Sequence, residues 1–144
     1  MEIKFKKLSE TADIPQRGSE KAAGYDLRAN IEQPQAVNPH ETVMIGTGLA
    51  IAIPEGYYGA IMARSGISAK RGLRPANCVG VCDADYRGEY MVAVHNDSNK
   101  IQTVAPHEKI AQLLVLPVAT AEFVEVAELD DTDRGDGGFG STGA

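Results

Sequence analysis

The sequence predicts an all-β domain. Short runs of aliphatic, aromatic and β-branched residues recur along the chain, and Gly and Pro separate them at turns such as 54–56, 71–75 and 87–89. Short strands divided by such turns are typical of a β-sandwich or a β-barrel. The chain has 144 residues, of which 43% are hydrophobic, which suits one domain with a buried core.

The strand signals follow one another along most of the chain. The first alternates Ile3 and Phe5 with lysines, and the last, AEFVEVAEL, alternates again. Only SGISAKRG, residues 65–72, favours a brief helix. We expect strands at 2–8, 23–29, 41–54 (two short pieces), 56–63, 80–83, 89–96, 109–118 and 121–129.

The C-terminus differs in composition from the rest of the chain. We expect a catalytic β-barrel domain over 1–129 and a flexible Gly-rich segment over 130–144, joined by the acidic stretch ELDDTDRGD. Five of the last eleven residues are glycine, so this segment cannot bury enough side chain to offset the entropy of ordering. It nevertheless carries an Arg, a Phe and a Ser-Thr pair, which a merely solubilising tail does not need.

Composition excludes several classes of partner. The net charge of −6 argues against a nucleic-acid-binding surface, and no apolar run is long enough to span a membrane. The N-terminus has no signal-peptide core, so the cytoplasm is the expected compartment. We expect Cys78 and Cys82 to be buried packing residues, since the three histidines lack metal-ligand spacing.

Residues 80–92, GVCDADYRGEYMV, predict a β-hairpin with its turn at 83–88. Asp83 is the last residue of an apolar strand, so we expect its carboxyl group to be partly desolvated, with a pKa tuned for a general base. Tyr86 lies near the tip of the predicted hairpin. The alternative is an ordinary hairpin with Asp at its turn.

Three further positions combine polar groups with predicted strands. Arg64, Ser65 and Gly66 follow a strand and open the predicted helix, which suits either a phosphate site or a turn capped by Ser65. Asp26 lies on a short strand and is either a surface residue or a group near a cation. Gln112 interrupts an apolar strand, where it satisfies neighbouring backbone groups or holds a water.

Taken together, these segments resemble the five ordered motifs of the trimeric deoxyuridine triphosphatases, or dUTPases. The resemblance covers residues 3 to 144, and its motifs are AGYDLRA, ARSGIS, VGVCDADYRGE, EKIAQLL and RGDGGFGSTG. It implies a jelly-roll-like, distorted β-barrel and a homotrimer with sites shared between subunits. It also implies hydrolysis of dUTP to dUMP and pyrophosphate, with Mg²⁺ as cofactor. That reaction keeps uracil out of DNA and supplies dUMP for dTMP synthesis.

The resemblance assigns roles to the residues singled out above. Asp83 would activate the water that attacks the α-phosphorus, and Gln112 would position that water. Tyr86 would lie under the deoxyribose and leave no room for a 2′-hydroxyl. The predicted hairpin would also exclude the 5-methyl group of thymine.

The remaining roles concern substrate and metal. Uracil would be read by the backbone of Val81, Cys82, Asp83 and Met91 together with Asn77. The phosphate chain would be held by Arg64, Ser65 and Gly66, and Asp26 would approach Mg²⁺ through water.

The resemblance also implies that the Gly-rich segment, residues 130–144, is a lid supplied by another subunit. Phe139 would stack on uracil, Arg134 would meet the γ-phosphate, and Gly140, Ser141 and Thr142 would wrap the remaining oxygens. Closure over bound nucleotide would expel water from the site.

Two features depart from the family pattern. His107-Glu108-Lys109 replaces the usual Gly-Asp-Arg, and Cys82 replaces an aliphatic residue. Two other functions remain open from the sequence: a dCTP deaminase on the same fold, and a non-catalytic nucleotide-binding or signalling trimer.

Overall fold

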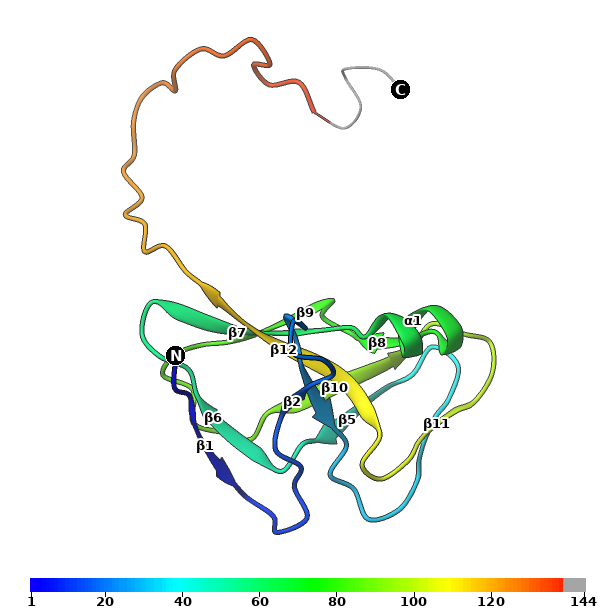
Figure 1. Cartoon of the computed structure of the whole chain (residues 1–144). Coiled ribbons are helices and arrows are strands. Elements are labelled where there is room, and N and C mark those ends of the chain that lie inside the picture. Colours follow the sequence, from blue (N-terminus) through cyan, green and yellow to red (C-terminus); the bar gives the residue numbers. More distant parts are fainter. Residues whose placement is uncertain (139–144) are drawn as a thin grey trace.

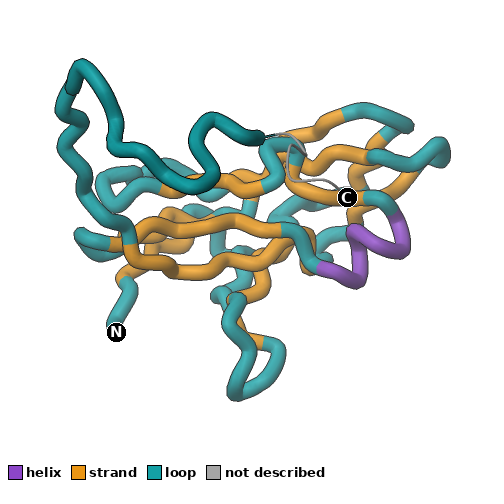
Figure 2. Tube along the Cα trace, turned by 90° about the horizontal axis from the view of Figure 1, so that it is seen from above, coloured by secondary structure: helices purple, strands orange, loops and turns teal. Residues whose placement is uncertain are grey.

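The structure is a computed structural model that describes residues 1–138. The predicted lid residues Phe139, Gly140, Ser141 and Thr142 lie outside the described residues. The described chain contains one helix, α1 (Ser65–Arg71), at one end of the body (Figures 1 and 2). Its strands are β1 (Lys4–Lys7), β2 (Gln16–Arg17), β3 (Tyr25–Arg28), β4 (Gln35–Val37), β5 (Thr42–Gly46), β6 (Leu49–Ala52), β7 (Tyr57–Met62), β8 (Leu73–Pro75), β9 (Val79–Cys82), β10 (Met91–Asn96), β11 (Gln102–Val104) and β12 (Lys109–Pro117).

The strands form four antiparallel sheets. The largest has the order β2-β3-β12-β7-β9, and a three-stranded sheet has the order β5-β10-β8. Two further pairs, β1-β6 and β11-β4, complete the body. The predicted all-β class is confirmed, although within residues 1–138 the strand pairing does not close into a continuous barrel.

The core lies between these sheets and follows from strand alternation. Along β10, Val92 and Val94 are buried while Met91 is exposed, as a period of two requires. Leu27 of β3 and Leu113 of β12 are buried in the same cluster. The side chain of buried Asn96 donates hydrogen bonds to the carbonyls of Val37 and Lys100, so this polar group is satisfied.

The predicted hairpin over 80–92 is wrong in its pairing. β9 pairs with β7, whereas β10 pairs with β5 and β8, so residues 83–90 cross from one sheet to the other. Gly80 and Cys82 turn inward against β7, and the amide of Tyr90 donates to the carbonyl of Leu49 in the opposite layer. These contacts with distant strands replace the local pairing that the sequence favours.

The predicted strand over 121–129 is also wrong for the single chain. The last strand, β12, ends at Pro117, and the chain then leaves the body as an extended segment (Figure 1). Phe123 is 98% exposed and Leu129 is 85% exposed. An alternating sequence forms a strand only when another strand pairs with it, and this segment has none within residues 1–138. The division between body and lid at residue 129 remains a prediction.

The structure also bears on the expected burial of the two cysteines and on membrane-spanning segments. Cys82 is buried as expected, but Cys78 is exposed in the turn before β9, so the expectation is wrong for Cys78. In the part of the chain that the structure describes, no helix has the length and apolarity needed to cross a membrane.

Gly48 should be essential to the junction between β5 and β6. Its φ is +67°, and a Cβ there would overlap Asn30 and Ala12. We expect Gly48→Ala to lower the free energy of unfolding by about 2–4 kcal/mol, because it combines backbone strain with overpacking. Gly18→Ala is the control, since a Cβ at Gly18 meets nothing within 4 Å. Urea unfolding of both variants checks this, and equal stabilities would contradict it.

Candidate active site

One group of the predicted site residues lines a single cavity in the structure. This cavity, of about 290 Å³, lies between the edge strand β9 and strands β5 and β10. Its lining includes Asn77, Val81, Cys82, Asp83, Tyr86 and Met91. We call it the β9 cavity. The residues predicted to contact uracil and deoxyribose, apart from Phe139, therefore surround one space, although β9 and β10 belong to different sheets.

Tyr86 is held in place over the β9 cavity by its own loop. Its hydroxyl donates a hydrogen bond of 3.0 Å to the carbonyl of Glu89. A Cβ on Gly88 would overlap the Tyr86 ring, so the loop needs glycine there. The Glu89 carboxylate in turn accepts a hydrogen bond of 2.8 Å from the amide of Gly48. The aromatic ring is thus placed by contacts that exist without substrate.

Asp83 is exposed, so the expected desolvation of this carboxylate is wrong for the single chain. The residue follows directly after an edge strand, and its backbone carbonyl accepts a hydrogen bond from the amide of Tyr86. Burial of Asp83 would require a surface that the single chain does not provide.

The cavity also contains residues that sequence reasoning missed. Tyr90 and Glu89 line it, together with Met44, Ile61 and Gly80. Burial raises the pKa of the Tyr90 hydroxyl above its ordinary value, and the adjacent Cys82 thiol adds to this shift. Burial likewise raises the pKa of Cys82. Tyr90 occupies a buried position in a run of apolar residues, which resembles ordinary core in the sequence.

A second group is centred on Asp26. One carboxylate oxygen accepts a hydrogen bond of 2.8 Å from Arg64 Nε, and the other lies 2.7 Å from Lys109 Nζ. Lys109, which replaces the family arginine, therefore keeps an ion pair with Asp26. Partial burial raises the pKa of Asp26, but the hydrogen bond from Lys109 and the charge of Arg64 outweigh it. The pKa lies below its ordinary value.

These contacts limit how Asp26 could hold a metal. Both of its oxygens already face cations, so direct coordination of Mg²⁺ would bring a third positive charge to one carboxylate. Within residues 1–138 no group of three His, Cys, Asp or Glu side chains could hold a metal ion. A contact through water fits better, because carboxylate oxygens retain free lone pairs and Mg²⁺ keeps several of its waters.

Gln112 lies beside this group on β12. It is paired with Asp26 of β3 on one side and with Met62 of β7 on the other. Its Nε2 donates a hydrogen bond of 2.9 Å to the carbonyl of Ala63, which leaves its oxygen as an acceptor. A Cβ on Gly24 would overlap that oxygen, so glycine is required for this conformation.

Helix α1 begins beside the same group. Arg64 is its N-cap residue, and no side chain caps its first turn in the described chain. The alternative that Ser65 caps the helix is therefore wrong. Ser65 and Gly66 are exposed, and a Cβ at Gly66 would meet nothing within 4 Å. Space therefore remains at this helix start.

The two groups do not meet within one chain. Cys82 pairs with Gly59, and Gln112 pairs with Met62, so strand spacings place the Cα atoms of Cys82 and Gln112 about 14 Å apart. Asp83 follows Cys82 along the chain and lies still farther from Gln112. The side chains of Asp83 and Gln112 therefore cannot share one water molecule in the single chain.

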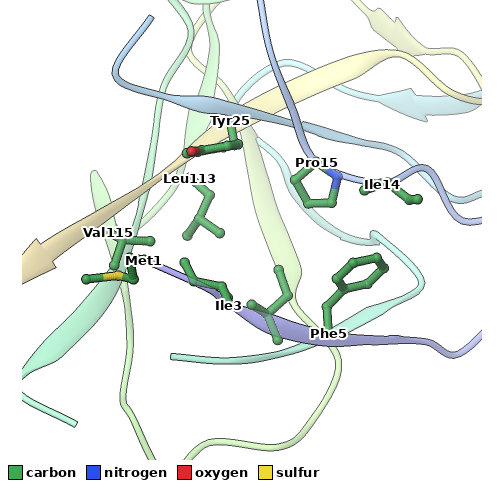
Figure 3. A pocket seen from close by; sticks show the side chains of 9 residues that line it. Met1, Ile3, Phe5, Ile14, Pro15, Tyr25, Leu113 and Val115 are labelled. Atoms are coloured by element: carbon green, nitrogen blue, oxygen red, sulfur yellow. The ribbon is translucent and has the colours of Figure 1, made fainter. Parts of the chain in front are cut away.

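Two other regions lie apart from both groups. Arg134 is exposed, and its Nε donates to the carbonyl of Gly137. An apolar groove of about 240 Å³ lies beside β1 and contains none of the predicted site residues (Figure 3). Its lining is Met1, Ile3, Phe5, Ile14, Pro15, Tyr25, Ile51, Leu113 and Val115.

Comparisons with known proteins agree with the fold and the motifs. The dUTPase family model matches residues 10–143. A deoxyuridine 5′-triphosphate nucleotidohydrolase from Bdellovibrio bacteriovorus is 48% identical over 142 residues, covering 98% of this chain and 95% of the relative. One from Nautilia profundicola is 47% identical, covering 99% of each chain.

Solved structures give the same result. A mutant dUTPase of Staphylococcus bacteriophage 80alpha with dUpNHpp has a TM-score of 0.86 at 29% identity, covering 99% of each chain. A mutant dUTPase from phage phi11 of S. aureus, in which a structural Mg(II) ion is coordinated, has a TM-score of 0.78 at 28% identity. That match covers 89% of this chain and 98% of the phage protein.

Fold and site together define an all-β protein with a cavity of about 290 Å³ beside β9 and a separate group in which Arg64 and Lys109 pair with Asp26. With nearly the whole sequence matched, the chain belongs to the dUTPase family.

The Asp26 ion pairs predict a specific pH dependence. We expect Asp26→Asn to lower the free energy of unfolding at neutral pH by about 1–3 kcal/mol, because two cations lose their partner. The native pKa of Asp26 lies below its unfolded value, so this contribution is complete above the unfolded pKa. It is lost as the pH falls through the native pKa. Urea unfolding of both proteins from neutral pH to about pH 2 checks this. A constant difference across that range would contradict it.

Proposed function

We propose that this chain is a dUTP diphosphatase, which hydrolyses dUTP to dUMP and pyrophosphate. The observation that carries the proposal is the match of all five motifs and of residues 10–143 to the dUTPase family. The named activity of the relatives, at 47–48% identity over nearly the whole chain, supports the same reaction.

The chemical step needs a base and a positioned water. Asp83 accepts a proton from the water, and the oxygen of that water forms a bond to the α-phosphorus. At the same time the bond between the α-phosphorus and the bridging oxygen breaks, and this oxygen leaves with the pyrophosphate. Gln112 orients the water through the side-chain oxygen that its bond to Ala63 leaves free. Catalysis then rests on position and on charge stabilisation rather than on a covalent intermediate.

Selection of the nucleoside takes place in the β9 cavity. The backbone of Val81, Cys82 and Asp83 on edge strand β9, with Met91 and the amide of Asn77, contacts the uracil edge. Tyr86 supports the deoxyribose and excludes a 2′-hydroxyl. The locked position of Tyr86 supports this role, because a ring that could swing away would not exclude a ribose.

The phosphate chain lies against the second group. Arg64 supplies positive charge, and Ser65 and Gly66 expose the uncapped start of α1. Mg²⁺, bound to phosphate oxygens and water, would neutralise charge on the phosphates, and Asp26 would contact that hydration shell. The structural Mg(II) ion of the phage relative supports a magnesium requirement in general terms.

The enzyme acts as a homotrimer whose sites are shared between subunits. What supports this is the separation of Asp83 from Gln112, which one chain cannot overcome. The surface around β9 also exposes apolar side chains, with Met44, Val79, Val81 and Met91 between 39% and 62% exposed. A second subunit set against this face would bury these residues, desolvate Asp83 and bring a second group to it.

Residues 130–144 form the lid of a neighbouring site. Arg134 contacts the γ-phosphate, Phe139 stacks on uracil, and Gly140, Ser141 and Thr142 surround the phosphates. The extended segment after β12 supports this role, since it carries residues 130–138 away from the body of the same chain.

Asp83→Asn tests the reaction directly. We expect it to lower kcat by about 10²–10⁴-fold while binding of a non-hydrolysable dUTP analogue persists, because only the base is lost. Asp85→Asn is the matched control: it removes the same charge from the same exposed loop and should remain active. The assay is pyrophosphate release with dUTP, UTP, dTTP and dCTP in the presence of Mg²⁺.

Four outcomes would contradict the proposal. Full activity of Asp83→Asn would remove the assigned base. Ammonia release from dCTP would indicate the deaminase, and binding without pyrophosphate release in the wild type would indicate a non-catalytic trimer. Full activity of a chain truncated before Arg134 would remove the lid from the mechanism.

A further inference from the structure

Arg64 and Asp26 are joined by one hydrogen bond, whereas the same two residue types form two bonds elsewhere in the chain. Arg64 reaches Asp26 through Nε alone, at 2.8 Å from Oδ1. Arg74 donates to both oxygens of Asp97, from Nε at 2.6 Å and from Nη2 at 3.0 Å. Two parallel bonds are the frequent and stronger form of an arginine–carboxylate pair. The single bond of Arg64 therefore needs a specific cause.

Lys109 occupies the oxygen that a second bond from Arg64 would need. Its Nζ lies 2.7 Å from Asp26 Oδ2, and the Asp26 side chain is only 12% exposed, so little water competes for that oxygen. On Asp97, no lysine or second arginine takes the corresponding place within residues 1–138. Asp26 thus holds two cations, each on one oxygen.

A local irregularity of β12 brings Lys109 to this face of the sheet. Gln112 lies opposite Asp26, and in a regular strand Lys109, three residues earlier, would point to the other face. The register shifts between Lys109 and Ala111, so Lys109 lies opposite Arg28, which shares a face with Asp26. The backbone therefore specifies which side chain reaches Asp26 Oδ2.

This arrangement leaves the outer part of the Arg64 guanidinium available. Nη1 lies 3.5 Å from the Lys109 carbonyl, at the limit of a hydrogen bond, and Nη2 donates to no acceptor within residues 1–138. A two-bond pair with Asp26 would use one of these groups and leave fewer donors for a ligand. Phosphate oxygens are acceptors that match the geometry of a guanidinium fork.

We propose that Lys109 is a positioning residue for phosphate binding. By holding one oxygen of Asp26, it restricts Arg64 to a single bond with that carboxylate and leaves both terminal nitrogens of Arg64 for the phosphate chain. Lys109 acts through Asp26 and does not itself contact the nucleotide. The inference rests on the proposed function in one respect, namely that the phosphates bind beside Arg64.

Lys109→Met tests the geometry of the pair in the free protein. Without Lys109, Arg64 should form two bonds with Asp26, so one of its Nη–Hη signals should become resolved in proton–nitrogen NMR spectra. In the wild type these signals should resolve only when a non-hydrolysable dUTP analogue binds, while the Nε–Hε signal keeps its hydrogen bond. Spectra of Arg64→Lys assign the signals. Identical Arg64 signals in the free wild type and Lys109→Met would overturn the inference.

A double-mutant cycle separates positioning from direct contact with phosphate. Lys109→Met should bind the analogue about 10- to 100-fold more weakly, because a charge-assisted hydrogen bond from Arg64 to phosphate is lost. In the Asp26→Asn background the same change should weaken binding about threefold or less. The amide has only one oxygen and cannot accept two bonds from Arg64, so only the effect of the lost charge remains. Calorimetric titration of the full chain gives these values.

Two controls define the result. Lys70→Met makes the same substitution at an exposed lysine of α1, and its affinity for the analogue should not change. Deoxyuridine, which carries no phosphate, should bind the wild type and Lys109→Met equally in an NMR titration. A weaker binding of deoxyuridine to Lys109→Met would show a general disturbance of the site and would overturn the inference.

The opposing outcomes are distinct. An equal loss of affinity in the native and Asp26→Asn backgrounds would show that Lys109 contacts phosphate directly, and equal affinity of wild type and Lys109→Met would remove its role altogether. If Lys109→Met does not fold, the wild-type spectra decide, because an Arg64 Nε–Hε signal that loses its hydrogen bond on analogue binding would overturn the inference. Failure of the wild type to bind the analogue would instead contradict the proposed function.

Discussion

The pairing of β7 with β12 on one side and β9 on the other is the constraint on which the site depends. It sets Gln112 of β12 opposite Met62 of β7, and Cys82 of β9 opposite Gly59 of β7. Strand β7 therefore lies between Gln112 and Cys82. Hydrogen-bonded strands cannot slide past one another by one residue without turning every side chain to the opposite face. The distance between Asp83, the proposed base, and Gln112, proposed to orient the water, is therefore fixed by the backbone, and no change of rotamer can close it.

Each half of the site is organised before substrate binds, and glycines make this possible. Gly88 accommodates the Tyr86 ring, Gly24 accommodates the Gln112 amide, and Gly46 accommodates the Glu89 carboxylate. In each case a methyl group would overlap the functional side chain. On the cationic side, Asp26 fixes Arg64 and Lys109 through ion pairs of 2.8 and 2.7 Å. Such positioning is worth most in a reaction that has no covalent intermediate.

Local sequence features predicted the residues of the site better than their arrangement. The all-β class and the brief helix after Arg64 follow from short-range patterns, and the structure confirms them. The grouping of Tyr86 with Asn77 follows from the family resemblance, and both residues line the β9 cavity. The pairing of β9 with β10 was wrong, because alternation shows that two segments are strands but not which strands they join. The strand predicted at 121–129 was wrong for a related reason, since no strand within residues 1–138 pairs with this segment.

Other features had no local signal. Lys109 stands where the family has arginine, and a shift of register in β12 between Lys109 and Ala111 accompanies its ion pair with Asp26. His107, in the place of the family glycine, adopts a φ of +60°, so the backbone keeps the conformation that favours glycine. Tyr90 resembles a core residue in the sequence, whereas the structure places it in the lining of the β9 cavity. Such properties depend on contacts between segments far apart in the sequence.

The central claim, that each site takes Asp83 and Gln112 from different subunits, is tested most directly by mixing two inactive variants. Asp83→Asn and Gln112→Ala would be unfolded together in equal amounts, refolded, and assayed for pyrophosphate release from dUTP. Random assembly should place both intact residues at roughly a quarter of the sites, so the mixture should recover about that share of wild-type activity. A mixture as inactive as either variant alone would show that both residues act within one chain, and the account would be contradicted.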